Sequence, residues 1–311
     1  MDDTTNAAAR RHQPVLVRET CELLAVRAGD VVLDATVGLG GHARVLAEAS
    51  GPAGRMIGLD VDPSNLEWAG RRLAGVDCRV HLVKANFADI ASVLPTLGVS
   101  RVDVLFADLG VSSPQLDEPA RGFSFQHDGP LDMRLDPELD ATAADLVNRL
   151  KEKELGDLIY FNAQERAARR IARRICEARR EGRITTTRRL ADLVAGAVGA
   201  HPGSRKLKIH PATRTFLALR IAVNNELGNL SALLQQAPDV LAPGARFGVI
   251  AFHSVEDKPV KDDFRRRKNE RLYRIVTKKP VTASPAERKA NPRSRSAKLR
   301  VAQRLPAEPE A

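Results

Sequence analysis

The sequence predicts an α/β protein, with a Rossmann-like, doubly wound and mostly parallel sheet interrupted by an inserted all-helical domain. Short apolar segments alternate with helical segments in the first third of the 311-residue chain. The first of these segments runs directly into a glycine-rich turn. The alternation stops after residue 132, gives way to helical sequence, and returns near residue 245. Strands of buried composition that alternate with helices are typical of a parallel sheet covered on both faces.

Four short apolar segments are expected to form the parallel strands. They cover residues 31–34, 55–60, 79–84 and 102–108, and three of the four end on Asp. A helix is expected over residues 42–49. Another is expected to begin at Asp62-Pro63, because proline is tolerated in the first turn of a helix.

The chain is expected to fold as two domains. Residues 1–132 and 211–311 form a discontinuous core, and residues 133–210 form the inserted helical domain. Within the insertion, residues 165–180 place alanine and isoleucine on one helical face and arginine largely on another.

Further helices and a strand follow the amphipathic segment. Thr186 or Thr187 can cap the next helix, because threonine side chains accept hydrogen bonds from the first backbone N–H groups. Residues 203–211 are expected to be a basic linker and residues 213–234 a long helix. Residues 245–252 return to the strand pattern and end at His253.

The charge is distributed unevenly along the chain. The whole sequence has 49 Lys and Arg against 39 Asp and Glu, a net charge of +10. The net charge is −6 for residues 1–133, +7 for residues 134–215 and +9 for residues 216–311. Residues 258–304 alone carry 17 basic against 4 acidic side chains, which suits either a nucleic-acid partner or a solvated tail. The aromatic content of 4% argues against a platform of stacking rings.

Several classes of protein are excluded. No apolar segment approaches the roughly 20 residues that a membrane span needs, and the polar N-terminus lacks a secretory pattern. The three scattered cysteines form neither a disulfide framework nor a zinc motif. We therefore expect a cytoplasmic protein without a metal site. The oligomeric state stays open, with a homodimer as one alternative.

The glycine-rich turn indicates a nucleotide-like ligand. It runs from Asp34 through Gly38, Gly40 and Gly41, and Asp60 lies 20 residues beyond Gly40, where a carboxylate can bind ribose hydroxyls. The glycine spacing permits a dinucleotide, but Asp34 would repel a pyrophosphate. S-adenosylmethionine carries an ammonium, a ribose and no phosphate, so we favour it over NAD.

A second polar turn follows the fourth strand. Asp108 is followed within a few residues by Ser112 and Ser113, at the strand end where open α/β sheets bind ligands. An exocyclic amine of cytosine or adenine is a poor nucleophile, and a carboxylate that accepts its N–H can hold it in line with a sulfonium methyl group. Such a transfer needs no metal. The alternative is a polar turn that only ends the strand.

Together these residues resemble the bacterial 16S rRNA (cytosine-N4)-methyltransferase family, methyltransferase H, also called MraW. The resemblance covers about residues 12–300. It is carried by segments 12–16, 34–42, 58–63, 108–117, 121–125, 130–134, 214–221, 252–257 and 293–299. It implies a methyltransferase core with a helical insertion. It also implies S-adenosylmethionine as methyl donor, and a decoding-centre cytidine of 16S rRNA in the small ribosomal subunit as substrate.

The resemblance also implies site residues. The cofactor contacts that it implies are Gly40, Gly41, His42, Asp60, Phe87, Asp108 and Gln115, to which the charge argument adds Asp34. Its departures, at Leu135, Val255 and Lys258-Pro259, remove no functional group.

The remaining candidates concern the substrate. Asp108 can orient the amine, bind the cofactor, or do both. Ser112 and Ser113 can hold the cytosine edge, and His253 can contact the base with Glu256 or Asp257 orienting it. The expected contacts to RNA phosphates are Arg166, Arg169, Arg170, Arg173, Lys206, Lys208, Arg293, Arg295 and Lys298.

Two other classes remain as alternatives. A nicotinamide oxidoreductase would respond to NAD and not to S-adenosylmethionine. A nucleic-acid-binding structural protein with a vestigial cofactor fold would keep its cellular role in an Asp108→Ala variant. Electrostatics alone also permits DNA as the substrate, and only the resemblance selects RNA.

Overall fold

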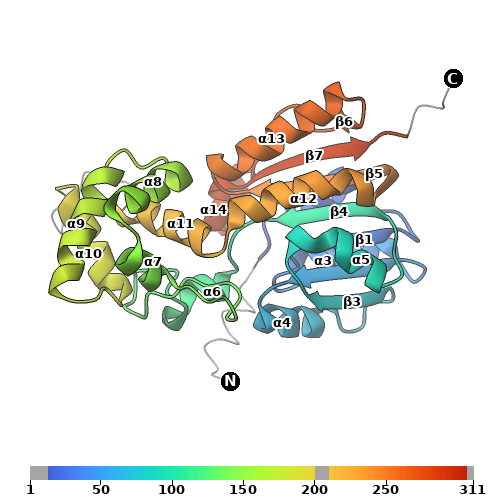
Figure 1. Cartoon of the computed structure of the whole chain (residues 1–311). Helices are drawn as coiled ribbons and strands as arrows, with labels where there is room; N and C mark the ends of the chain where they lie inside the picture. Colours follow the sequence, from blue (N-terminus) through green and yellow to red (C-terminus); the bar gives the residue numbers. More distant parts are fainter. Residues whose placement is uncertain (1–12, 200–209, 307–311) are drawn as a thin grey trace. The chain divides into compact units, whose positions relative to one another are not determined.

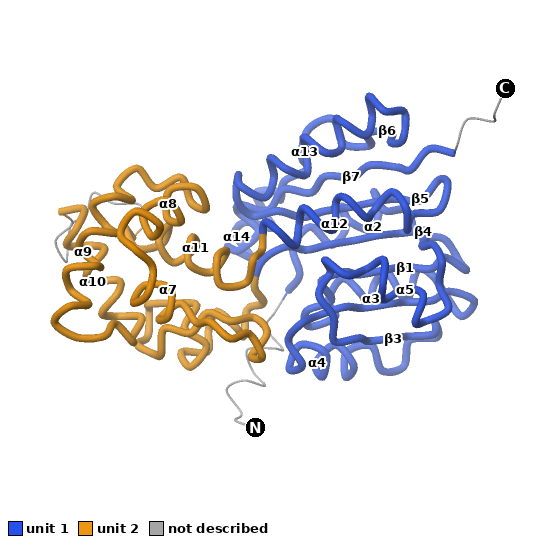
Figure 2. The backbone as a smooth tube through the Cα atoms, in the orientation of Figure 1, with its two compact units in different colours: residues 1–110, 227–311 blue, residues 111–226 orange. Residues whose placement is uncertain are grey.

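The computed structural model describes residues 13–199 and 210–306, and the chain divides into two compact units (Figure 2). Unit 1 consists of residues 1–110 and 227–311, and unit 2 of residues 111–226. The helical segment expected over residues 133–210 lies within unit 2.

Unit 1 contains a seven-stranded sheet in the order β3-β2-β1-β4-β5-β7-β6 (Figure 1). The strands are β1 (Val31–Asp34), β2 (Arg55–Asp60), β3 (Arg79–Lys84), β4 (Val102–Asp108), β5 (Leu241–Ala251), β6 (Tyr273–Ile275) and β7 (Lys298–Arg304). Strands β1 to β5 are parallel, and β7 runs antiparallel to both β5 and β6. This confirms the Rossmann-like, mostly parallel sheet, and the four strands predicted first have the expected bounds.

Helices cover both faces of the sheet. One face packs against α5 (Ile90–Thr96), α12 (Glu226–Val240) and α13 (Ser254–Asn269). The other packs against α2 (Val17–Leu24), α3 (Gly41–Ser50) and α4 (Pro63–Leu73). Successive residues of β1, Val32 and Leu33, are fully buried in opposite clusters, because side chains alternate across a strand. The uniformly apolar strands therefore reflect burial on both faces.

The basic C-terminal segment is folded into unit 1. It forms most of α13, then β6, α14 (Pro285–Ala290), the 3₁₀ helix η3 (Pro292–Ser296) and β7. Strand β7 lies between β5 and β6, and its residues Leu299 and Val301 are fully buried. Residues 258–304 are thus an ordered part of the sheet and its cover, and the solvated-tail alternative is wrong for this segment.

Unit 2 is helical. Its elements are α6 (Ser113–Asp117), η2 (Pro119–Arg121), α7 (Ala143–Arg149), α8 (Glu152–Ala163), α9 (Ala168–Glu181), α10 (Thr187–Ala197) and α11 (Ala212–Val223). Its core contains the apolar face predicted for the basic helix, including fully buried Ile171 and Ile175. Thr186 caps α10 by accepting a hydrogen bond from the backbone N–H of Arg189.

The prediction of one long helix over residues 213–234 is wrong. Helix α11 ends at Val223 and α12 begins at Glu226. Asn225 between them has a φ of 48°, which an α-helix cannot contain and which asparagine tolerates better than most residues. The predicted strand over 245–252 begins earlier, at Leu241. Within the described ranges, no helix has the length and apolar character required to cross a membrane.

Candidate functional site

The site lies at the carboxyl ends of β1 and β4, where the strand order of unit 1 reverses. From β1 the chain proceeds to β2 and β3 on one side, and then to β4 and β5 on the other. Ligands of open α/β sheets bind at such a switch point. Asp34 ends β1 and Asp108 ends β4, so the fold brings together two carboxylates that are 74 positions apart in the sequence.

Asp34 is a buried carboxylate with little compensation. Asp34 is only 1% exposed. Its Oδ1 accepts a hydrogen bond from the backbone N–H of Thr36 at 3.1 Å. Burial, with a smaller contribution from the charge of Asp60, raises the pKa of Asp34 to about 7. A cationic ligand group placed here would favour the ionised form.

The glycine turn approaches α4 closely. Gly40 has a φ of 76°, and a Cβ at this position would lie 3.1 Å from Cα of Ala69. Gly41 is crowded from the other side, because a Cβ there would lie 2.9 Å from Cγ of Pro14. The turn therefore requires glycine for both conformation and space.

Asp60 holds this turn in place. Its Oδ2 accepts hydrogen bonds from the backbone N–H of Gly38 at 3.0 Å and from Asn65 Nδ2 at 3.1 Å. Its Oδ1 accepts one from the backbone N–H of Asp62 at 2.8 Å. Burial raises the pKa of Asp60 to about 6. A carboxylate has about four acceptor positions, so the three bonds leave room for about one ligand hydroxyl.

His42 is buried beside Asp108. Its Nε2 lies 2.8 Å from the carbonyl oxygen of Val15, to which it can donate, and its Nδ1 lies 3.6 Å from Asp108 Oδ2. The ring also packs against Phe106 with a centroid distance of 4.9 Å. These contacts place His42 inside the fold, between the carbonyl of Val15 and the carboxyl group of Asp108.

Asp108 presents an acceptor without a partner. Its Oδ1 is buried and has no hydrogen-bond partner among the described residues. Burial, together with the charges of Asp34 and Glu256, raises the pKa of Asp108 well above its usual range. Its backbone N–H donates to Thr36 Oγ1 at 2.6 Å, which fixes the end of β4 to the turn after β1. A buried acceptor of this kind is costly unless a ligand donor completes it.

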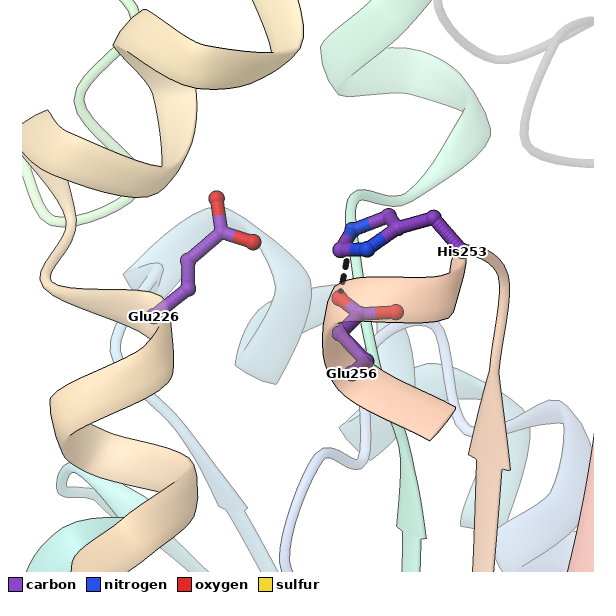
Figure 3. A group of neighbouring side chains, drawn as sticks. All are labelled: Glu226, His253 and Glu256. Carbon is purple, nitrogen blue, oxygen red and sulfur yellow. Dashed lines mark ion pairs between the residues drawn. The ribbon is translucent and has the colours of Figure 1, made fainter. Parts of the chain in front are cut away.

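His253 and Glu256 form a second pair at the end of β5 (Figure 3). His253 Nε2 lies 3.0 Å from Glu256 Oε1, an ion-pair contact without the alignment of a hydrogen bond. Glu256 Oε2 accepts the backbone N–H of Phe252 at 3.0 Å, and Glu256 is only 2% exposed. Nδ1 of His253 is buried and has no hydrogen-bond partner within the described ranges.

The neighbouring acidic residues have other roles. Asp257, which the sequence offered as a second partner for His253, accepts a 2.6 Å hydrogen bond from Arg300 Nε and lies 3.6 Å from Lys298 Nζ. Figure 3 also draws Glu226, the first residue of α12, whose oxygens accept hydrogen bonds from Arg220 at 2.7 and 2.8 Å.

The N-terminal segment supports the glycine turn from behind. Residues 13–16 contribute the Pro14 and Val15 contacts described above. Leu16 N–H donates to Glu287 Oε1 at 2.7 Å, and Asn291 Nδ2 donates to the carbonyl of Gln13 at 2.9 Å. The C-terminal segment therefore holds residues 13–16, and these residues in turn contact Gly41 and His42. Sequence reasoning missed this arrangement because nothing local couples residues 270 positions apart.

The remaining predicted cofactor residue of unit 1 is Phe87. It begins η1 just after β3, is half-buried, and packs against the apolar cluster on the α5 face of the sheet. The carboxyl ends of β2 and β3 are adjacent, with Asp60 opposite Lys84. Phe87 thus follows the strand next to the one that carries Asp60.

Three residues that the sequence analysis assigned to the site lie at the start of unit 2, in or next to α6. Ser112 is the N-cap of α6, and its backbone N–H donates to Gln115 Oε1 at 2.8 Å in a capping box. Ser113 and Gln115 are buried, with 6% and 5% exposure. Their local role is to begin α6 with a fixed geometry.

The predicted RNA contacts differ in their surroundings. Arg169 is tied to α8 through Asp157 Oδ1 at 2.6 Å and Lys153 O at 3.0 Å. Arg173 lies 3.7 Å from Glu152. Those that are exposed on the surface are Arg166, Arg169, Arg170, Arg173, Arg293 and Arg295, whereas Lys298 is half-buried beside Asp257. Lys206 and Lys208 lie outside the described residues.

Two functional contacts were not anticipated from the sequence. The Thr36 hydroxyl links the ends of β1 and β4, and Glu256 is held by the backbone before α13. Glu256 stands three residues after the N-cap His253, which is the spacing of a capping box, but it accepts the N–H of Phe252 instead of that of the N-cap. Thr36 had no such signal, since its partner ends a distant strand.

Comparison with known proteins gives a family. The model of the MraW methylase family matches residues 9–305. A protein of Syntrophobacter fumaroxidans named ribosomal RNA small subunit methyltransferase H is 47% identical over 311 residues, covering 95% of this chain and 97% of its own length. A protein of the same name from Symbiobacterium thermophilum is 48% identical, covering 97% of this chain and 99% of its own length.

Likeness to solved structures is more distant. The rRNA methylase from Streptococcus thermophilus has a TM-score of 0.45 and 10% identity, covering 94% of this chain and 98% of that chain. The family match and the relatives at nearly half identity over almost the full length show that this chain belongs to the MraW methylase family.

Proposed function

We propose that this protein is a cytoplasmic S-adenosylmethionine-dependent methyltransferase that methylates the exocyclic N4 of a decoding-centre cytidine in 16S rRNA of the small ribosomal subunit. Family membership and the names of its relatives support action on small-subunit rRNA. The observation that carries the chemistry is the buried, unpartnered Oδ1 of Asp108 at the switch point of the sheet.

The residues of unit 1 fit the proposed donor. S-adenosylmethionine supplies a methyl group activated by its positively charged sulfur. Asp34 offers a buried carboxylate for the ammonium, and Asp60 keeps acceptor capacity for about one ribose hydroxyl. Gly40 and Gly41 let the ligand approach the backbone, and Phe87 offers a half-buried ring beside the adenine. His42 acts through Asp108.

Asp108 orients the amine of the substrate. Its Oδ1 accepts one N–H of the exocyclic nitrogen, which directs the nitrogen toward the methyl group. The arrival of a cationic donor favours ionised Asp108 and offsets the repulsion from Asp34 and Glu256. No metal is required, because the sulfonium already activates the methyl group.

His253 takes the proton that the amine must lose. The Glu256 carboxylate beside Nε2 favours the tautomer that carries its proton there, which leaves the lone pair on Nδ1. Nδ1 has no other partner within the described residues and can accept the second N–H of the amine. The N–C bond forms as the C–S bond breaks, and the proton passes to Nδ1.

Unit 2 supplies substrate contacts in this proposal. Ser112 and Ser113 hold the cytosine edge, and Gln115 contributes to the cofactor site through the start of α6. The exposed arginines of α9 and of the C-terminal segment hold phosphates and position the RNA without specifying sequence.

Methyl transfer to small subunits tests the proposal. Subunits that lack the modification should accept a labelled methyl group from S-adenosylmethionine when the intact protein is added, and NAD should not alter its thermal stability. Asp108→Ala, which removes the acceptor oxygen, should lose most of the transfer while the protein still binds RNA. Absence of transfer by the intact protein would reject the proposal, and full activity of Asp108→Ala would reject the assigned role.

A further inference from the structure

A groove between two helices of unit 2 is separate from the site described above. Helices α9 and α10 pack side by side (Figure 1) and enclose a groove of about 410 Å³. Its lining residues are Arg174, Thr186, Arg188, Arg189, Asp192, Leu193 and Gly196. This volume lies within the range of ordinary ligand sites.

Positively charged side chains dominate the groove. Arg174 has a single distant ion pair, 3.9 Å from Glu177, and its side chain is 53% exposed. The side chain of Arg188 is exposed and makes no ion pair within the described residues. Arg189 is held in place by the carbonyls of Arg183 at 3.1 Å and Ala178 at 3.4 Å. Two exposed guanidinium groups and one that is held by hydrogen bonds therefore line the same groove.

The backbone at the start of α10 does not supply the anion site. The N–H of Arg188 already donates to Asp128 Oδ1 at 3.0 Å, and that of Arg189 donates to Thr186 Oγ1 at 3.3 Å. An anion in the groove would thus be bound by arginine side chains. Guanidinium groups bind phosphate oxygens in bidentate fashion.

One acidic side chain in the groove narrows the class of ligand. Asp192 is exposed and forms no ion pair with the arginines in the part of the chain that the structure describes. The carboxylate of Asp192 would repel a ligand whose polar groups are all phosphates. It can, however, accept a hydrogen bond from a ribose 2′-hydroxyl. The 2′-hydroxyl is also the group by which proteins distinguish RNA from DNA.

We propose that the α9–α10 groove binds the ribose-phosphate backbone of single-stranded RNA, with Arg174 and Arg188 on phosphates and Asp192 on a 2′-hydroxyl. Arg170 continues the path, because it precedes Arg174 by four residues on the same exposed face of α9. The inference rests on the proposed function only in taking RNA as the substrate. It assigns the contacts to the RNA strand, and the preference for ribose, to groove residues that are not among those proposed for the methyl transfer.

Gly196 permits a test that preserves the fold. A Cβ at Gly196 would meet nothing within 4 Å, and glutamate has a higher helix propensity than glycine. Gly196→Glu therefore places a carboxylate in the groove without steric cost. The probe is an 18-nucleotide single-stranded RNA of mixed sequence, and fluorescence anisotropy of the full chain measures its dissociation constant at several salt concentrations.

The expected result has three parts. Gly196→Glu and the double variant Arg174→Gln/Arg188→Gln should weaken RNA binding about tenfold. The double variant should also reduce the slope of log K against log salt by about 1.4, since each contact to a single strand contributes about 0.7. Asp192→Asn should reduce the preference for the RNA over the DNA of the same sequence. Arg180→Gln, which removes an exposed arginine of α9 outside the groove, is the control for charge and should bind nearly as the unchanged protein does.

Three outcomes would overturn the inference. The first is unchanged RNA binding by Gly196→Glu. The second is equal loss in the Arg180→Gln control. The third is weaker binding of Gly196→Glu to intact small subunits but not to the RNA probe, which would assign the groove to a ribosomal protein. None of these depends on methyl transfer, so failure of the groove and failure of the proposed reaction are distinguishable.

Discussion

At the scale of residues, the site of unit 1 is a set of buried carboxyl groups. Asp34, Asp60 and Asp108 all have raised pKa values, and burial is the largest cause for each. Burial of like charges is costly without a cation. Without a cation these carboxyl groups therefore lower the stability of the fold, and a ligand that carries an ammonium and a sulfonium would relieve the cost.

Replacing Asp34 by Asn should stabilise the free protein while weakening donor binding. The pKa of Asp34 is about 7 in the folded protein and near 4 in an unfolded chain, so unfolding releases a proton between these values. The free energy of unfolding thus falls as the pH rises from about 4 to about 7. Asp34→Asn removes this pH-dependent loss. The free energy of unfolding of the variant should therefore exceed that of the unchanged protein by about 2 to 4 kcal/mol at pH 8, and the two should be equal near pH 4.

Thermal unfolding of the free variant from pH 4.5 to 8.5 and calorimetric titration with S-adenosylmethionine check this prediction. The hydrogen bond from Thr36 N–H can persist to the amide oxygen, so the fold is retained. Donor affinity of the unchanged protein should increase as the pH rises through about 7. A variant that binds the donor normally would contradict the role of Asp34.

Replacing Glu256 by Gln should lower kcat and leave KM nearly unchanged. Glutamine can donate to His253 Nε2 and thereby move the proton of the ring to Nδ1, where it blocks proton acceptance. Loss of a positioned base typically costs about 10²- to 10⁴-fold. The rise of kcat with pH that reports an imidazole base should disappear, which a merely structural role would not produce.

Asp257→Asn is the matched control for Glu256. Its carboxylate is adjacent in sequence but pairs with Arg300 and Lys298. The control should lower stability and keep the pH profile of kcat. If both variants show the same profile as the unchanged protein, His253 is not the proton acceptor.

Residue types at the strand ends were predictable, but their partners were not. Asp34 and Asp108 were recognised because each ends an apolar strand. The burial of His42 against the Val15 carbonyl, and the hydrogen bond from Gly38 N–H to Asp60, depend on segments that meet only in the fold. Sequence reasoning therefore located the site and left its internal bonding open.

At the scale of elements, the glycine turn depends on its distance from α4. Gly40→Ala should destabilise the protein by about 1 to 3 kcal/mol, because both the backbone strain and the contact with Ala69 oppose a Cβ. It should also weaken donor binding. Gly75→Ala is the control, since Gly75 has a similar φ of 83° but no neighbour within 4 Å of a Cβ.

Chemical denaturation of both variants separates strain from close approach. Gly40→Ala should lose more unfolding free energy than Gly75→Ala, and the difference measures the cost of the contact with α4. Equal losses of stability and normal donor binding in both would show that the turn does not need this close packing.

Elements with local signals were predicted, and those that depend on distant pairing were missed. The first four strands are apolar and bounded by turns, so their sequence alone defines them. Strand β7 contains Arg300 and Arg304 and resembles a basic tail. It becomes a strand because β5 and β6 pair with it on both sides. Arg300 is accommodated by its ion pair with Asp257.

At the scale of the whole molecule, the two units do not separate by charge. Unit 1 carries 29 basic and 23 acidic residues, and unit 2 carries 20 and 16. The acidic N-terminal segment and the basic C-terminal segment are parts of one sheet. The net charges of −6 for residues 1–133 and +9 for residues 216–311 therefore do not correspond to separate units, and both units carry a net positive charge.

RNA binding and donor binding should nevertheless respond differently to salt. Exposed arginines release counterions on binding phosphates, whereas the carboxyl groups of the proposed donor site are buried or partly buried. Raising the salt from 50 to 200 mM should weaken RNA binding by at least tenfold and change donor affinity by less than twofold. Anisotropy and calorimetry over the same salt series check this. Parallel weakening of both would indicate that exposed charges bind the donor.

The most direct test of the account is mass-spectrometric mapping of 16S rRNA from small subunits treated with this protein and S-adenosylmethionine. We expect one added methyl group, on N4 of a single decoding-centre cytidine, present with the unchanged protein and largely lost with Asp108→Ala. A methyl group on carbon 5, on a ribose hydroxyl or on another base, or no added methyl group, would contradict it.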